Sequence, residues 1–326
     1  MFEMLLKPKT LLRRPYLMGL FALFAVSVAV ILSLKIFPES SSFLVVVFTI
    51  IPVIPVMVKL IEHEEYILEH SRHLLRAHPI ITIYAWYFLG VVVAFAAWFL
   101  LLPAATGQTV FSEQTGAIYD FRGPSGFALL EHGDPVNPVS TIECDPVIVE
   151  RMSRHGVDRC EAVDFNKDHI EEFLFYKDGQ REFILELKEY QQDRENYRPI
   201  PYRAFLLRHI LFNNLQIFLF VMLTSFIFGA GALFVITWNA SIVGVFMADM
   251  FTQGMSKLSL AGFLVHGVPE FVSFFVAALA GGILSVVFLR HKPSDPQFKR
   301  IVLDFGILCA FSVLLLFIAA FLEVYL

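Results

Sequence analysis

The chain has 326 residues, of which 57% are hydrophobic and only 17% are charged, and its mean hydropathy is +0.66. These values exclude a soluble globular protein and a disordered chain, because neither class carries so much apolar surface for so few charges. The formal net charge of −5 gives no argument by itself for a nucleic-acid partner or for an anionic lipid surface. The sequence therefore predicts a protein that works within or across a lipid bilayer.

Three uncharged stretches in the first hundred residues are long enough to cross a bilayer. The first, residues 15–34, would form about 30 Å of helix at roughly 1.5 Å per residue, which matches the hydrocarbon core. It is too long for a signal peptide, and no small-residue cleavage site follows it. We expect a transmembrane hairpin over residues 1–60 with spans at about 15–36 and 40–58, a cytoplasmic amphipathic helix at 61–79, and a third span at 80–103.

Residues 104–203 form the only stretch long and polar enough to fold in water. They contain nineteen acidic residues against eleven Lys and Arg, a local net charge of −8. The apolar stretches 173–176 and 183–185 flank an Asp178-Gly179 dipeptide, a pattern typical of a β-hairpin. We expect a small β-rich or α+β extracellular domain here.

Two of the three cysteines, Cys144 and Cys160, fall in this acidic domain. A disulfide between them would close a loop of about fifteen residues and contribute on the order of 3 kcal/mol if the domain faces an oxidising compartment. Two small buried thiols are the alternative.

A four-span bundle is expected over residues 204–326. Residues 210–248 contain no Asp, Glu, Lys or Arg, which suits two spans with a break at 237–239. Pro269 lacks the amide hydrogen that a helix interior needs, so we expect the sixth span to restart there. The four spans are then expected at about 210–236, 239–255, 269–289 and 301–322.

The distribution of basic residues predicts the orientation of these seven spans. With a cytoplasmic N-terminus, the inner segments hold eleven Lys and Arg, whereas the short outer loops hold only Lys35 and Lys257. The sequence thus predicts an all-α polytopic protein of the cell membrane with about seven transmembrane helices. Its extracellular domain is inserted between spans 3 and 4, and its C-terminus is also extracellular.

Several polar residues in the C-terminal spans are candidates for a functional site, because a polar group in hydrocarbon must find a partner or water. His266 and Glu270 are four residues apart and share one helix face, so an ion pair or a shared proton is possible. A structural clasp against Asn213 or Asn214 is the alternative. The full candidate set is Asn213, Asn214, Asn239, Asp249, His266 and Glu270.

Small residues recur at every fourth position of the sixth span, a spacing that lets helix backbones approach closely. Packing within the bundle is favoured over a dimer seam, and no residue pattern supports a homo-oligomer directly. The packing residues expected from this pattern are Gly229, Gly231, Ser273, Ala277, Gly281, Gly282 and Ser285.

The sequence contains partial metal-binding patterns, but the residues that define each pattern are missing. Asp164, Asn166 and Asp168 have the opening spacing of a calcium loop, but His169 and Phe175 replace the required glycine and glutamate. The histidines and glutamates of residues 63–78 lack a zinc-hydrolase spacing and suit a solvated juxtamembrane helix. No nucleophile stands with a base. The sequence therefore gives no catalytic residue, metal ligand or cofactor, and does not favour an enzyme.

A series of motifs in the C-terminal half resembles the stage II sporulation protein M family in its archaeal form, from about Ile80 to the end of the chain. The resemblance implies a multi-pass membrane protein that assembles with partners, as an anchor or scaffold and not as a hydrolase. The motifs are Asn213-Asn214, Phe228-Gly229-Ala230-Gly231-Ala232, Trp238-Asn239-Ala240-Ser241, His266-Gly267-Val268-Pro269-Glu270, Leu279-Ala280-Gly281-Gly282-Ile283 and Glu323-Val324-Tyr325.

Two functions from different classes follow. The first is a membrane scaffold or assembly component with protein partners on the extracellular side. The second is a transporter, channel or lipid-moving protein with a polar site at Asn213, Asn214, His266 and Glu270. An intramembrane hydrolase is a third interpretation, but it has no proposed nucleophile.

Overall fold

The chain divides into two compact units, each with its own core. A computed structural model describes residues 7–37, 41–70, 79–122, 144, 146–163, 172–186, 199–228, 231–252, 257–290, 292 and 294–325. The first unit, here called the membrane unit, comprises Met1–Ala117 and Asn213–Glu323. The second, here called the sheet unit, comprises Ile118–Phe212 and Val324–Leu326.

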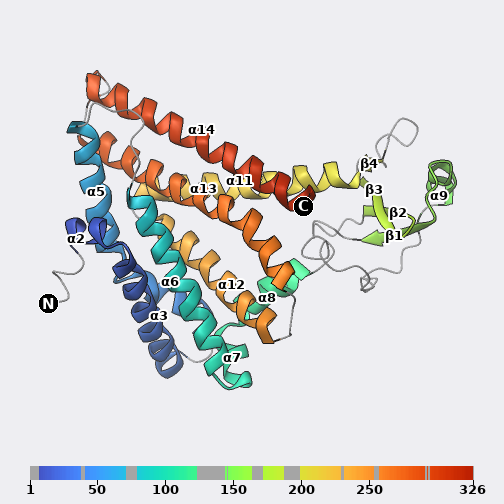
Figure 1. Cartoon of the computed structure of the whole chain (residues 1–326), viewed down its shortest axis with the longest axis horizontal. Helices are drawn as coiled ribbons and strands as arrows, with labels where there is room; N and C mark the ends of the chain where they lie inside the picture. The colour runs from blue at the N-terminus through green and yellow to red at the C-terminus, as the bar shows by residue number, and fades with distance from the viewer. Residues whose placement is uncertain are drawn as a thin grey trace. The chain divides into compact units, whose positions relative to one another are not determined.

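Seven helical segments in the described part of the chain are long and apolar enough to cross a membrane, which confirms the predicted number of spans. Figure 1 shows the helices of the membrane unit packed as a bundle. The helices that build these spans are α3 (Tyr16–Ile36), α4 (Ser41–Ile50) continued by α5 (Ile54–His70), α6 (Pro79–Leu101), α11 (Tyr202–Phe228), α12 (Ala232–Thr252), α13 (Lys257–Arg290) and α14 (Pro296–Tyr325). Three shorter helices accompany them: α2 (Pro8–Arg13), α7 (Ala104–Val110) and α8 (Ser112–Arg122).

Two helix boundaries differ from those expected. Helix α11 ends at Phe228 and α12 begins at Ala232, so the break lies near the Gly229–Gly231 stretch and not at residues 237–239. Helix α13 runs unbroken through Pro269 and does not restart there. Proline lacks only one backbone hydrogen bond, and a membrane bundle tolerates that loss when neighbouring groups satisfy the freed carbonyl.

Glycines set the closest helix crossings of the membrane unit. A Cβ atom added to Gly90 of α6 would lie 2.3 Å from the carbonyl oxygen of Gly19 on α3. A Cβ on Gly244 of α12 would lie 2.6 Å from the carbonyl oxygen of Val92 on α6. At both crossings the backbones touch without intervening side chains, so any larger residue would push the helices apart.

Helices α7 and α8 fold back after the third span and insert a polar side chain into the membrane unit. The ring of Phe111, between these helices, is fully buried and packs against Phe95 and Phe99 of α6. Gln114 of α8 is also fully buried: Ser42 Oγ donates to its Oε1 at 2.8 Å, and its Nε2 donates to Ser241 Oγ at 3.2 Å. Gln114 thereby links α8 to α4 and α12.

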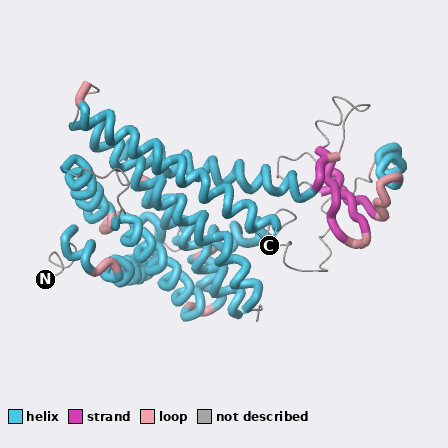
Figure 2. Tube along the Cα trace, turned by 45° about the horizontal axis from the view of Figure 1, so that its top comes forward, coloured by secondary structure: helices cyan, strands magenta, loops and turns pink. Residues whose placement is uncertain are grey.

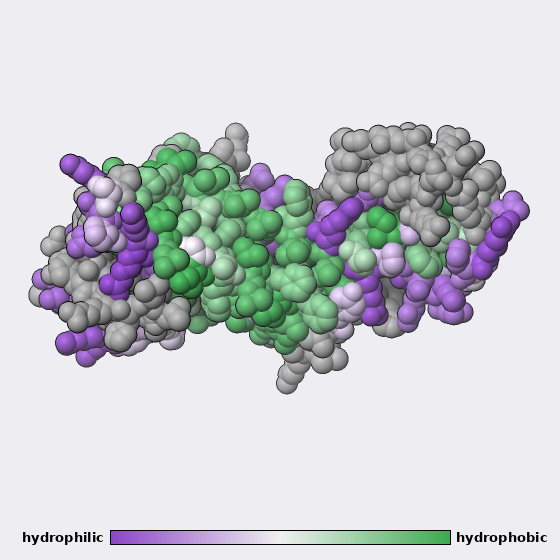
Figure 3. Space-filling model, turned by 90° about the horizontal axis from the view of Figure 1, so that it is seen from above, coloured by the Kyte–Doolittle hydropathy of each residue, from purple (hydrophilic) through white to green (hydrophobic). Residues whose placement is uncertain are grey.

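The surface of the membrane unit is consistent with a lipid environment. Figure 3 shows a broad band of hydrophobic residues over this unit, bounded by hydrophilic residues at the left end of the view. Helices α11 and α14 contribute many exposed apolar side chains, among them Phe220, Ile227, Leu303 and Leu314, each more than half exposed. Because lipid tails solvate such side chains, their exposure needs no further protein contact.

The sheet unit is built on four antiparallel strands in the order β1-β2-β3-β4. Figure 2 shows these strands gathered in one place. The hairpin predicted around Asp178-Gly179 is confirmed, since both residues have positive φ angles of 51° and 77°, as a tight two-residue turn requires. The strands are β1 (Arg159–Val163), β2 (Glu172–Lys177), β3 (Gln180–Glu186) and β4 (Ile200–Pro201).

Both faces of this sheet are covered, which explains why residues 172–176 of β2 are all buried. Side chains of successive strand residues point to opposite faces. Leu174 and Ile184 pack against the first turns of α11 through Tyr202 and Phe205. The other face packs against α9 (Pro146–Ser153) in a cluster of Ile148, Met152, Ala162, Phe173, Phe175 and Leu185.

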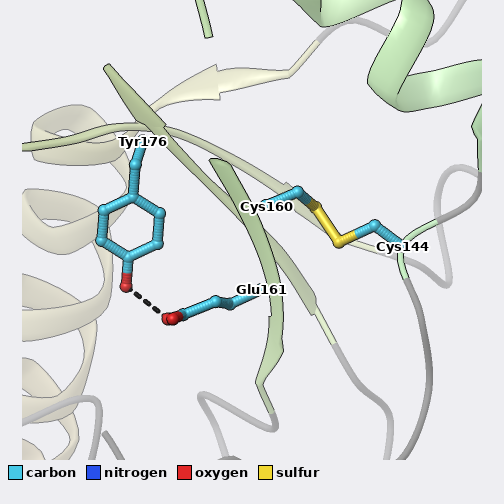
Figure 4. The surroundings of a disulfide bond; sticks show 4 residues. All are labelled: Cys144, Cys160, Glu161 and Tyr176. Carbon is cyan, nitrogen blue, oxygen red and sulfur yellow. Dashed lines mark hydrogen bonds between the residues drawn. A yellow bond between two sulfur atoms is a disulfide. The ribbon is translucent and has the colours of Figure 1, made fainter. Parts of the chain in front are cut away.

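A disulfide links the segment before α9 to strand β1. It joins Cys144 to Cys160, with their Cα atoms 6.3 Å apart (Figure 4). Beside it, Tyr176 donates its hydroxyl hydrogen to Glu161 Oε2 at 2.6 Å. The crosslink holds α9 against the sheet. Because it lowers the entropy of the unfolded chain, it stabilises the fold by on the order of 3 kcal/mol.

Substituting alanine at two glycines will separate the cost of a blocked crossing from the effect of a longer side chain. We expect Gly90→Ala to lower the free energy of unfolding by about 1–3 kcal/mol, because its Cβ would overlap the backbone of α3. Gly306→Ala on α14 is the matched control, since its Cβ would meet no heavy atom within 4 Å and alanine favours the helix. The measurement is unfolding of both variants in detergent, and equal stability would contradict the crossing.

Candidate functional site

The polar residues of the C-terminal spans meet at Asn214 and Glu270. Asn214, on α11, is only 4% exposed, and its side-chain amide donates a hydrogen bond to the Glu270 carboxyl group on α13. The Asn213 Nδ2 atom donates to Asn214 Oδ1 at 3.4 Å. Asn214 therefore uses both ends of its side chain and joins α11 to α13.

A third helix contributes Glu323, which the sequence did not identify as a site residue. Glu323 lies near the end of α14, close enough to Glu270 for the two carboxyl groups to interact electrostatically. Two signals pointed to it: its position as an acidic residue directly after the last apolar run, and its place in the Glu323-Val324-Tyr325 motif. The candidate site thus consists of Asn213, Asn214, Glu270 and Glu323, contributed by three helices of the membrane unit.

His266 is not part of this group. Its ring donates a hydrogen bond to the Gly262 backbone within its own helix and lies edge-on to Phe263, with ring centroids 5.7 Å apart. Among the described residues no ion pair joins His266 to Glu270, although they are four residues apart on α13. The predicted pairing does not form because Glu270 hydrogen bonds across to α11, whereas the His266 ring bonds along α13.

The remaining polar candidates lie elsewhere in the membrane unit. Asn239 Nδ2 donates to the Val235 carbonyl at 2.8 Å, one turn back along α12. Asp249 is half-buried one turn before the end of the same helix. Neither residue joins the Asn214 and Glu270 group.

The small residues of the sixth span are used within the chain. Ser273 Oγ donates to the Ser312 carbonyl of α14 at 3.0 Å, and Ser312 Oγ donates back to the Ser273 carbonyl at 3.3 Å. A Cβ on Gly281 would lie 2.3 Å from the Met222 carbonyl oxygen of α11. Ser225 adds a 2.6 Å hydrogen bond from α11 to the Ala278 carbonyl.

The other members of the packing set have different surroundings. Ala277 and Gly282 are buried in α13, whereas Ser285 is half-buried. Gly231 directly precedes α12, and Gly229 lies outside the described residues. The contacts made by Ser273 and Gly281 place the small face of α13 against α14 and α11.

A hydrogen bond between two hydroxyl groups joins α6 to α12. The Tyr87 and Thr237 hydroxyl oxygens lie 2.6 Å apart, and both residues are fully buried. Next to this pair, a crevice between α6, α11, α12 and α13 is lined mainly by aromatic and aliphatic side chains and has no room for a water molecule. Tight packing of Phe88, Phe271 and Phe275 fills this region.

The chemistry available to the site is hydrogen bonding, charge interaction and proton exchange at its two carboxyl groups. Two carboxyl groups and two amides offer donors and acceptors but no activated nucleophile. In the part of the chain that the structure describes, no group of three or more His, Cys, Asp and Glu could hold a metal ion. The calcium-like residues Asp164, Asn166 and Asp168 lie outside the described residues, as do residues 71–78 of the histidine-rich segment.

The fold and site together define a class: a polytopic helical membrane protein with an inserted, disulfide-linked α+β unit. The family model for stage II sporulation protein M matches residues 80–326. The chain therefore belongs to the stage II sporulation protein M family. It is also 32% identical over 138 residues to an uncharacterized protein, MJ0793, of Methanocaldococcus jannaschii, covering 41% of this chain and 76% of that protein. No solved structure matches.

Two asparagine variants will test whether Asn214 holds the helices together. We expect Asn214→Ala to lower the free energy of unfolding by about 1–2 kcal/mol, because it leaves the Glu270 carboxyl group without its buried donor. Asn239→Ala is the control, since Asn239 bonds only along its own helix among the described residues. Unfolding in detergent measures both. If the two variants lose equal stability, the Asn214 contact does not link the helices.

Proposed function

We propose that the protein is a membrane scaffold, an assembly component whose spans anchor an external unit that binds protein partners. One observation carries this proposal: several polar side chains inside the spans join helices of the same chain. Asn214 with Glu270, Ser273 with Ser312, and Tyr87 with Thr237 each bridge two helices. Polar groups committed to such bonds give a bundle of fixed geometry, which suits an anchor.

The proposed orientation places the N-terminus in the cytoplasm and residues 104–203 and the C-terminus outside the cell. Two independent features support it. The predicted inner segments contain eleven basic residues against two in the short outer loops. The Cys144–Cys160 disulfide belongs to a chemistry that persists in oxidising compartments.

The sheet unit is the proposed site of partner binding. It has its own two-faced core and a covalent crosslink, so it can present a fixed surface. The surrounding sequence, residues 104–203, has a net charge of −8, which favours partners with basic surfaces. Glu150 and Glu182 are exposed acidic residues of this unit.

Crosslinking in native membranes tests the scaffold. The expected result is a reproducible protein partner whose crosslinks map to residues 118–212. Recovery of this partner should fall with rising salt and in the Glu150→Gln, Glu182→Gln double variant. A Glu62→Gln variant is the control, because it removes an exposed carboxylate of the membrane unit that lies outside residues 104–203.

The transport alternative makes the opposite prediction about Glu270. Under the scaffold proposal, Glu270→Gln keeps an acceptor for Asn214 and leaves partner recovery and the cellular phenotype unchanged. A Glu270→Gln variant that folds normally, retains its partner and loses the phenotype would favour transport. Absence of any reproducible partner would overturn the scaffold.

A further inference from the structure

A compact basic segment precedes the first span. Lys7, Lys9, Arg13 and Arg14 supply four positive charges within eight residues that contain no acidic residue. All four side chains are exposed. Such a density of cations directly before a transmembrane helix is the arrangement that attracts anionic lipid headgroups.

The bundle holds these cations in place. Lys7 begins the segment as the N-cap of α2, and Arg13 ends that helix. Leu11 of α2 is fully buried, and α2 packs against α3, α5 and α6. The four charges therefore project from a helix docked on the membrane unit and not from a free tail, which lowers the entropy lost when a headgroup binds.

Few acidic residues compete for these cations in the described part of the chain. Within the described residues, none of these four cations forms an ion pair. Helices α3 and α6 contain no acidic residue. Helix α5 carries one acidic and one basic residue with described side chains, Glu62 and Lys59, and both are exposed. Its further glutamates, Glu64, Glu65 and Glu69, have side chains outside the described residues.

The segment also lies next to the hydrocarbon-facing surface. Tyr16, two residues after Arg14, begins α3, is 43% exposed and meets Trp86 edge-on at 6.5 Å. Tyrosine and tryptophan prefer the headgroup level of a bilayer. In Figure 3 the hydrophobic band of the membrane unit gives way to hydrophilic residues at its left end, the end at which Figure 1 shows α2.

We propose that Lys7, Lys9, Arg13 and Arg14 bind the phosphate groups of anionic phospholipids in the leaflet next to α2. The partner is an anionic lipid because the charges sit at the edge of an apolar surface, where a phosphate with attached acyl chains satisfies both. This inference does not depend on the scaffold function. If both proposals hold, the membrane unit of the scaffold also binds anionic phospholipids.

Lipid retention in detergent micelles tests the proposal, and micelles remove any effect of the substitutions on orientation. Full-length protein is mixed with phosphatidylglycerol or phosphatidylcholine, and bound lipids are counted by native mass spectrometry. The expected result is preferential retention of phosphatidylglycerol that weakens with salt. A Lys7→Gln, Lys9→Gln, Arg13→Gln variant should bind phosphatidylglycerol roughly a hundredfold more weakly.

Three comparisons make the result decisive. A Lys35→Gln, Arg154→Gln, Lys177→Gln variant loses the same charge from exposed positions elsewhere and should bind normally. A Lys7→Arg, Lys9→Arg, Arg13→Lys variant keeps the charges and should also bind normally. Inorganic phosphate should compete poorly. Equal retention of the two lipids, equal losses in the two charge-removal variants, or full competition by inorganic phosphate would each overturn the proposal.

Discussion

Helices in a bilayer gain almost nothing from the hydrophobic effect when they associate, because lipid tails are as apolar as their own side chains. Close backbone contact and hydrogen bonds between helices must therefore hold the membrane unit together. Backbones come into close contact at Gly90 and Gly244. Hydrogen bonds between helices are made by Asn214, Ser273 and Tyr87. The membrane unit depends on these few positions.

The same constraint accounts for the hydrogen bonds that the conspicuous polar residues make. Glu270 finds a donor on α11, and the His266 ring finds an acceptor on its own helix. Each satisfies a polar group that hydrocarbon cannot solvate. Figure 2 shows that the strands, in contrast, gather in the sheet unit, where a two-faced core and a disulfide stabilise a small fold.

The sequence predicted those features that depend on local composition. Seven apolar stretches predicted the seven spans, and Asp178-Gly179 predicted the hairpin, because each signal lies within one continuous stretch of sequence. Contacts between distant segments were not predictable in this way. Nothing near Gln114 indicates that it reaches Ser42 and Ser241, and nothing near Glu323 indicates that it approaches Glu270. Pro269 suggested a break that the surrounding bundle prevents.

A double-mutant cycle between Asn214 and Glu270 isolates the energy of one polar bond between α11 and α13. The single and double alanine variants would be unfolded with a denaturing detergent. If the Asn214–Glu270 bond joins α11 to α13, the coupling energy is about 1 kcal/mol, whereas Asn239 and Glu270, the reference pair, are additive. Additivity of Asn214 and Glu270 within roughly 0.3 kcal/mol would contradict it.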